Sequence, residues 1–280
     1  MSPGRRFRFH LQLGFTVLVC AFLIVPVIMS VMAGITENYF RGIASGVTLR
    51  WVGQVWGLYA GTIFLSMLIA VACLGCTIVL GVPAAYVLSK RQGRVARAIE
   101  ELLTLPLAVP GLAIAPALII TYGGYRDFRA SWLFILVGHV LYTLPFMMRS
   151  VLAVLSSANF RSLEEGAASL GAGFWRRFFD IVVPNCRSGI LAGSLMVVTL
   201  SMGEFNITWM LHTPVNKTLP VGLADSYASM RLEIASAYTV IFLVMIIPLL
   251  ILLQRYGQPR KEPSAPTEDA DNEPGRTDRP

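Results

Sequence analysis

Glu204 is the most unusual chemical group in the apolar part of this sequence. It lies in SMGEFNITW, within an apolar run over residues 188–210. A carboxylate inside a membrane segment is costly and usually faces a cavity or a partner. The helix from Gly189 to Glu204 would rise about 24 Å, which predicts a position in the outer half of a membrane. Glu204 either lines or gates a solute pathway, or it hydrogen-bonds within the bundle and fixes helix packing.

A few neighbouring and isolated groups complete the set of candidates. Met202 and Phe205 flank Glu204 and are pathway candidates, although such side chains more often fill a core or a constriction. His139 also lies in an apolar run, and we expect a packed, hydrogen-bonded histidine rather than a proton relay. Cys73 and Cys76 have no nearby His or Cys, so no disulfide and no metal site are predicted. No catalytic residue is predicted, which disfavours a membrane-embedded enzyme.

A polar, arginine-bearing stretch, Leu163–Pro184 (LEEGAASLGAGFWRRFFDIVVP), separates two long apolar runs. Ser162 and Glu165 have the S-x-x-E spacing of a capping box, which predicts a helix beginning at Ser162. Gly171 and Gly173 predict the end of that helix. A second short helix is expected over residues 174–181. The expected shape is a helix–turn–helix on the membrane surface, whose small residues leave room for another protein to pack closely.

The composition is that of an integral membrane protein in a lipid bilayer. Of 280 residues, 55% are hydrophobic and only 14% are charged, whereas about a quarter are charged in a typical soluble domain. The net charge of +7 does not indicate a nucleic-acid partner, because the basic residues are spread over segment ends without a recognition motif.

The apolar runs predict an all-α fold with six transmembrane helices. Residues 1–10 are a basic N-terminus, residues 11–33 an uncleaved first span, and residues 34–60 an extracytoplasmic segment with interfacial aromatics. The other spans are expected at residues 61–89, 102–122, 131–155, 188–210 and 236–253. Prolines should kink the third span. The tail, residues 254–280, is rich in Pro and charge and is expected to be disordered.

The distribution of basic residues predicts the orientation of these spans. With the N-terminus inside, most of the 23 Lys and Arg residues face the cytoplasm. Those that fall outside are Arg41, Arg50, Arg126, Arg129, Lys217 and Arg231. Because cytoplasmic loops carry an excess of Lys and Arg, both termini and the stretch Leu163–Pro184 are predicted to be cytoplasmic.

The same stretch resembles the "EAA" loop of inner-membrane permease subunits of binding-protein-dependent ABC importers. The loop pattern is Glu, two small residues, any three, Gly, any nine, Ile, any one, an apolar residue and Pro. Glu165, Gly171, Ile181 and Pro184 stand at the required offsets, and Pro184 should open the next apolar segment. The chain departs from the pattern at Gly166 and Val183, where the family usually has Ala and Leu. Residues 61–90, 105–118 and 138–153 also resemble spans of these permeases.

The resemblance implies a type I ABC importer permease (MetI-like) core over residues 61–253. In that family the loop, here residues 162–184 between helices 4 and 5, is a coupling helix that docks into a groove on a cytoplasmic ATPase. The residues expected to make this coupling surface are Glu164, Glu165, Ala167, Ala168, Leu170, Gly171, Ile181 and Pro184.

The resemblance also implies partners and a place in the cell. They are a cytoplasmic ABC ATPase dimer, a second permease subunit that is a paralogue rather than a copy, and an extracytoplasmic substrate-binding protein, in a bacterial inner membrane. This chain has no G-x-x-x-x-G-K-[ST] phosphate loop, so ATP and Mg would bind to the ATPase, and neither a cofactor nor enzymatic activity is expected here.

The sequence leaves open the class of transporter and the identity of the substrate. A six-span secondary transporter or channel without an ATPase is the alternative, although it should show an inverted repeat or more intramembrane charge pairs. The segments Gly203–Phe205 and Thr218–Ala228 look most like the branch for small oxyanions, phosphonates and polyamines. We expect 2-aminoethylphosphonate or a related phosphonate first. The other candidates are polyamine, sulfate or molybdate, ferric iron and thiamine.

Overall fold

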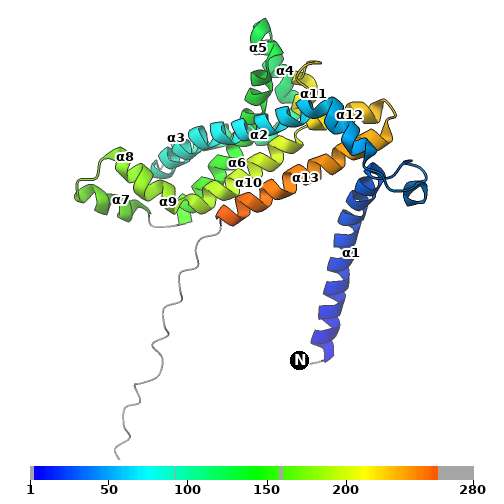
Figure 1. The fold of residues 1–280 in the computed structure, drawn as a ribbon. Helices are drawn as coiled ribbons and strands as arrows, with labels where there is room; N and C mark the ends of the chain where they lie inside the picture. The colour runs from blue at the N-terminus through cyan, green and yellow to red at the C-terminus, as the bar shows by residue number, and fades with distance from the viewer. Residues whose placement is uncertain (1–2, 92, 158–159, 258–280) are drawn as a thin grey trace, which may run out of the picture.

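The computed structural model describes residues 3–91, 93–157 and 160–257, and in this part of the chain it is all-α, as predicted (Figure 1). A single isolated bridge joins Thr36 and Val47 in the loop after the first helix. The helices are α1 (Pro3–Gly34), η1 (Gly42–Ser45), α2 (Arg50–Lys90), α3 (Arg94–Ala108), α4 (Gly111–Tyr122), α5 (Arg126–Ala130), α6 (Trp132–Ser157), α7 (Phe160–Ser169), α8 (Phe174–Arg177), η2 (Phe178–Val182), α9 (Val183–Asn185), α10 (Arg187–Gly203), α11 (Asn206–Leu211), α12 (Leu219–Ala228) and α13 (Leu232–Gly257).

The bundle is built on α2, α6 and α10, which pack against one another, with α13 against α2 and α10. Glycines on α10 allow a close approach to α6. A Cβ atom at Gly189 would lie 2.7 Å from the Ser150 carbonyl oxygen, and one at Gly193 would lie 3.1 Å from the Met147 Cα. The first contact is closer than a Cβ atom permits, and the second is tighter than most Cβ contacts. Small residues therefore set the α6–α10 distance, as is common between membrane helices.

Four of the described helices are each long and apolar enough to cross a membrane. They are Phe7–Gly34, Arg50–Lys90, Trp132–Ser156 and Leu232–Arg255. The segments Phe174–Asn185 and Arg187–Gly203 together would make a fifth, but they meet at an angle of 69°. The structure therefore places long helices at four of the six expected spans.

The two other expected spans are broken helices. Residues 102–122 were expected to form one kinked span, but α3 ends at Ala108 and α4 begins at Gly111. Val109 is extended (φ −92°, ψ 123°) because the following proline disfavours helical dihedral angles. Residues 188–210 are likewise interrupted at Glu204–Phe205, between α10 and α11.

Several helices begin before their predicted first residue. The second span was expected from residue 61, yet α2 begins at Arg50 and bends at Tyr59 (φ −126°, ψ 20°). The added turns pack through Trp51 and Val55 onto α13, so tertiary contacts extend this helix. The sixth span was expected from residue 236, and α13 begins at Leu232. Of the tail, residues 254–257 close α13, and residues 258–280 lie outside the described part of the chain.

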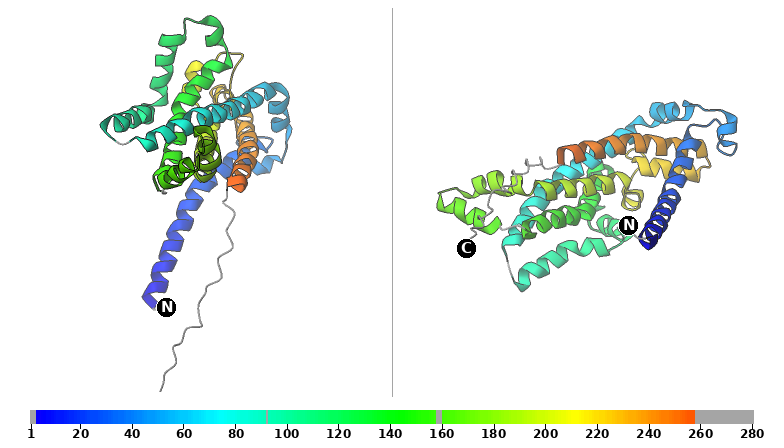
Figure 2. Two further views of the ribbon diagram at one scale, coloured as in Figure 1. Left: turned by 90° about the vertical axis from the view of Figure 1, so that its left-hand side faces the viewer. Right: turned by 90° about the horizontal axis from the view of Figure 1, so that it is seen from below.

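The first helix diverges from the bundle (Figures 1 and 2). It starts at Pro3, so most of the expected N-terminal segment, residues 1–10, belongs to the helix. Its end crosses α13, where a Cβ atom at Gly34 would lie 2.6 Å from the Ser236 carbonyl oxygen. In the most apolar 18-residue stretch of α1, no residue is buried by the rest of the described chain. Lipid or another subunit must therefore cover α1 in a membrane.

Candidate functional site

The stretch that resembles the coupling loop forms a helical hairpin at one end of the bundle (Figure 1). Its first helix begins at Phe160, so the predicted start at Ser162 is wrong by two residues. The predicted end is confirmed. Gly171 has φ 83°, Gly171 N–H donates to Ala168 O at 2.9 Å and Ala172 N–H donates to Ala167 O at 3.0 Å. These two hydrogen bonds form a Schellman cap. The cap needs a residue with positive φ, which favours glycine.

The second arm of the hairpin is longer than the sequence predicted. Helical backbone runs from Phe174 to Asn185, and residues Phe178–Val182 form a π-turn just before Pro184. Pro184 was expected to open the next apolar segment, but it lies inside this arm, and α10 begins at Arg187 after the 69° bend. In a regular α-helix the ring of Pro184 would clash with the carbonyl four residues earlier. The wider π-turn accommodates the ring.

A buried carboxylate joins the hairpin to the end of α2. Glu164 on α7 is 6% exposed, and its Oε1 accepts hydrogen bonds from the Tyr86 hydroxyl and the Lys90 Nζ, each at 2.5 Å. The Arg177 Nη1, from α8, lies 3.4 Å from the same oxygen. Three helices thus meet at one carboxylate. A sequence pattern could not reveal this, because Lys90 and Glu164 lie 74 residues apart.

Aromatic rings surround this junction. The Tyr86 ring centroid lies 5.3 Å from that of Phe178 and 6.1 Å from that of Phe174, and the Lys90 Nζ lies 4.3 Å from the Tyr86 centroid. Burial acts to raise the pKa of Glu164. The hydrogen bonds from Lys90 and Tyr86, with the charges of Lys90 and Arg177, outweigh it and lower the pKa below the usual Glu value. Glu164 is therefore a charged anchor.

The other predicted coupling residues lie mainly on the outer side of the hairpin. Glu165, Ala168, Gly171 and Pro184 are exposed, whereas Ala167 and Ile181 are half-buried. Leu170 is 90% exposed and Leu163 is 55% exposed. Glu164 thus faces the bundle. The apolar side chains on the outer face of the hairpin are not buried by any other part of the described chain.

The three pathway candidates do not share one surface. Glu204 lies in the break between α10 and α11, 7% exposed, and its Oε2 accepts hydrogen bonds from the N–H groups of Ile207 (2.9 Å) and Thr208 (3.2 Å). Met202 is buried among residues of α2, α10 and α13. Phe205 lines a separate apolar cavity of about 400 Å³ beside α12 and α13. Glu204 thus caps α11.

One histidine holds both sides of this break. The His139 Nδ1 lies 2.9 Å from the Ser201 Oγ on α10, and its Nε2 lies 2.8 Å from the Thr208 Oγ1 on α11. His139 is 1% exposed. The prediction of a packed, hydrogen-bonded histidine is confirmed. Its partners on two sides of a helix break were not foreseen, because the sequence showed a continuous apolar run there.

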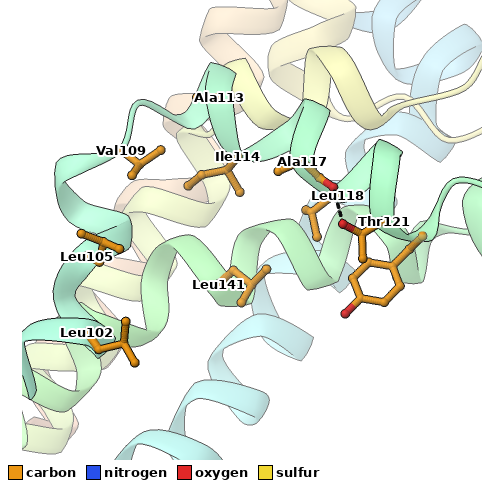
Figure 3. Close-up of a pocket in the computed structure, with 10 residues that line it drawn as sticks. Leu102, Leu105, Val109, Ala113, Ile114, Ala117, Leu118, Thr121 and Leu141 are labelled. Carbon is orange, nitrogen blue, oxygen red and sulfur yellow. Dashed lines mark hydrogen bonds between the residues drawn. The ribbon is translucent and has the colours of Figure 1, made fainter. Parts of the chain in front are cut away.

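The break between α3 and α4 opens an apolar cavity. Figure 3 shows α3 and α4 arching over α6, with Leu105 before the break, Val109 in it, Ile114 after it and Leu141 on α6. The cavity measures about 380 Å³. At its upper end, α4 begins beside the other break, since a Cβ atom at Gly111 would lie 3.3 Å from the Glu204 Oε1. Two interrupted helices therefore meet at Glu204.

A polar cavity of about 340 Å³ lies at the opposite end of the bundle from the hairpin, between α2, α12 and α13. Its wall includes Lys217, Asp225 and Arg231. Lys217 forms an ion pair with Asp225, and the Arg231 Nη1 donates to the Tyr59 hydroxyl at 3.0 Å. Within the described residues Arg231 has no carboxylate partner, so the cavity wall carries a net positive charge.

Known transport proteins are similar to this chain in sequence. The family "Binding-protein-dependent transport system inner membrane component" matches residues 77–262. A sulfate transport system permease of Synechocystis sp. is 26% identical over 247 residues, covering 82% of this chain and 87% of the relative. A Salmonella typhimurium permease named for 2-aminoethylphosphonate transport is 22% identical over 245 residues (87% and 92%). The molybdenum transport system permease of Azotobacter vinelandii is 26% identical over 198 residues (65% and 86%).

Two solved structures share the fold. A chain of an alginate-importing bacterial ABC transporter has a TM-score of 0.68 at 13% identity and covers 91% of this chain and 96% of its own length. A chain of a methionine ABC transporter in an inward-facing conformation has a TM-score of 0.58 at 15% identity (73% and 94%). The family match spans more than half of the sequence. The chain therefore belongs to the binding-protein-dependent transport system inner membrane components, the multi-pass permease subunits of ABC importers for small solutes.

Proposed function

We propose that the hairpin of α7 and α8 is the surface through which a cytoplasmic ABC ATPase dimer drives this permease. The observation that carries the proposal is the division of α7 into two faces. Glu164 fixes one face to α2, while Leu163 on α7 and Leu170 directly after it stay exposed on a hairpin that projects from the end of the bundle. A helix with an anchored polar side and a free apolar side is suited to helix-in-groove docking.

A substitution on the outer face tests this docking. Leu170→Asp should abolish co-purification of the ATPase in mild detergent, because a charge would be buried in an apolar groove. Val215→Asp is the matched control, since Val215 is 88% exposed at the other end of the bundle. The control should retain the ATPase. Equal retention by both variants, or equal loss, would contradict docking at α7, and a wild-type chain that binds no ATPase would favour a secondary transporter or channel.

The remaining partners follow from the same proposal. ATP and Mg bind to the ATPase, and this chain supplies part of the solute pathway. A second permease subunit, more suitably a paralogue than a second copy, faces it, and an extracytoplasmic binding protein delivers the solute. The uncovered apolar length of α1 leaves a surface in the membrane on which a neighbouring subunit can pack. Co-purified subunits identified by mass test the choice between paralogue and copy.

For the substrate, we infer a small oxyanion or phosphonate, with 2-aminoethylphosphonate first. Relatives named for sulfate, molybdenum and 2-aminoethylphosphonate transport support this class. The positively charged wall around Lys217 and Arg231 also favours anionic over purely cationic solutes such as polyamines. The test is uptake of labelled 2-aminoethylphosphonate, sulfate, molybdate, spermidine, ferric iron and thiamine in cells that lack this chain. Loss of spermidine uptake alone would overturn the oxyanion assignment.

A further inference from the structure

We propose that Glu164 is the joint that makes the coupling segment (Phe160–Asn185) and the end of α2 move as one unit. This inference rests on the proposed function, because it concerns how a push on α7 reaches the membrane helices. It adds a positioning role for Glu164, Lys90 and Tyr86, which do not face the docking surface.

The geometry of the junction suits force transmission. Lys90 and Tyr86 stand four residues apart on α2, so both side chains reach the same face of that helix. Each binds the Glu164 Oε1 at 2.5 Å, and the Glu164 side chain is only 8% exposed. Charge-assisted hydrogen bonds are directional and, when partly buried, are weakly screened by salt. The ring contacts of Phe174 and Phe178 with Tyr86 could slide, whereas these bonds fix direction as well as distance.

The helix on the other side of the joint extends to the far end of the bundle. α2 is helical from Arg50 to Lys90, with its bend at Tyr59. Near the far end, the Ser66 Oγ accepts a hydrogen bond from the Leu219 N–H at 2.7 Å, at the start of α12. The Tyr59 hydroxyl accepts from Arg231 in the polar cavity. A displacement applied at Lys90 therefore has a continuous path of packed and hydrogen-bonded groups to the opposite end.

The charges at the junction predict which substitution has the largest effect. Lys90 and Arg177 share one carboxylate, and the Arg177 Nε is buried without a hydrogen-bond partner. Glu164→Gln would leave these two cations facing each other. Lys90→Met would leave Glu164 with Tyr86 and Arg177. We therefore expect Glu164→Gln to be the more severe change, and the double variant to be no worse than Glu164→Gln alone.

Spectroscopy on the wild-type complex measures the joint directly. Spin labels at Phe179 and Val87, both exposed and both outside the predicted docking residues, report the distance between the coupling segment and the end of α2. In the full transporter this distance should be unchanged by adding ATP. In the Glu164→Gln complex the distance distribution should broaden or shift with ATP. A nucleotide-dependent change in the wild-type distance would overturn the proposal, as would a narrow, unchanged distribution in the variant.

Transport measurements in liposomes give the functional consequence. With ATPase, second permease and binding protein present, Glu164→Gln and Lys90→Met should retain ATP hydrolysis while solute uptake per ATP falls roughly tenfold, within the usual range of coupling between sites. Lys90→Arg keeps the positive charge and should retain the wild-type solute uptake per ATP. Arg91→Gln and Arg176→Gln are matched controls, because these arginines are the sequence neighbours of Lys90 and Arg177 but form no ion pair with Glu164 in the described part of the chain.

These experiments distinguish failure of the proposed function from failure of the Glu164 joint. If the wild-type chain binds no ATPase, the proposed function fails, and the joint with it. If the wild-type complex hydrolyses ATP and transports solute, but Glu164→Gln shows the wild-type uptake per ATP, then docking stands and the joint is wrong. If Glu164→Gln does not assemble, Lys90→Met and the wild-type distance measurement decide the proposal.

Discussion

Glu204 and Glu164 are the two buried carboxylates of the described chain, and their surroundings give them different roles. Glu204 accepts hydrogen bonds from backbone N–H groups at the start of α11, so it replaces helix bonds that the break at Phe205 removes. Glu164 is bonded to side chains from other helices. The first carboxylate thus stabilises a local backbone feature, and the second connects elements.

The capping role of Glu204 leads to a prediction about transport. Glu204→Gln should preserve uptake at normal protein abundance, because the Gln side chain keeps an oxygen that can accept from Ile207 and Thr208. Glu204→Ala should lower abundance, since loss of a cap costs about 0.5–2 kcal/mol. The measurement is uptake normalised to the amount of protein in the membrane. Loss of uptake by Glu204→Gln at unchanged abundance would instead support contact with the solute.

The lowered pKa of Glu164 predicts a pH dependence of stability. A carboxyl with a lower pKa in the folded state stabilises the fold fully above its unfolded pKa, about 4.3, and loses this contribution as the pH falls through the folded value. The difference in thermal unfolding between wild type and Glu164→Gln should therefore be constant from pH ~7 to pH ~5 and should shrink towards pH ~3. A difference that grows on acidification would contradict the assignment.

Helix interruptions, rather than continuous spans, shape the centre of this molecule. Pro110 separates α3 from α4, and the break before α11 is capped by Glu204 and held by His139. The two breaks meet where Gly111 approaches the Glu204 carboxylate. Unwound backbone at membrane depth is tolerated where protein or a cavity surrounds it. The packing of α6 with α10, by contrast, depends on small residues.

The packing of α6 with α10 predicts that the same substitution at two glycines affects stability differently. Gly193→Leu should destabilise the protein by about 1–3 kcal/mol, because the new side chain would overlap Met147 on α6. Gly75→Leu is the control, since no atom lies within 4 Å of a Cβ at that exposed position on α2. Thermal unfolding in detergent should show a lower midpoint for the first variant only. Equal midpoints would mean that α10 can move away from α6 without cost.

At the scale of the whole molecule, the chain has two chemically different ends. The coupling segment projects from one end, with Lys90 and the start of α3 close by. The loop after α1, the polar cavity and α12 lie at the other end, where the Tyr39 N–H donates to Glu233. We propose that the first end is cytoplasmic and that both termini lie on that side. The excess of basic residues in the segments assigned to that side supports this orientation.

Labelling in intact cells tests the orientation. A cysteine at Ala168 should be protected from a membrane-impermeant maleimide, and a cysteine at Val215 should react, in a chain whose own exposed cysteine, Cys20, is replaced by Ser. Both positions are exposed, so a difference reports the side of the membrane. Reaction at Ala168 with protection at Val215 would place the coupling segment outside and would remove the basis for an ATPase partner.

The sequence by itself determined the class of the molecule and singled out the segment that we propose as its coupling surface. Hydropathy and helix length follow from local composition, so an all-α membrane fold was predictable. The end of α7 at Gly171 was predictable as well, because glycine is the residue type that most readily adopts the positive φ of a helix end. The helix starts were less accurate, since packing extends α2 and α13 beyond their apolar runs.

Only the tertiary structure decided where the helices break and which polar groups meet. The apolar run over residues 188–210 gave no sign that α10 ends at Gly203, because Glu204, Ser201, Thr208 and His139 stabilise the break only when two helices come together. Glu164 was predicted to be part of the coupling surface, yet its partners come from α2 and α8. Hydrogen bonds and ion pairs between distant residues depend on the relative position of helices, which packing fixes and sequence periodicity does not encode.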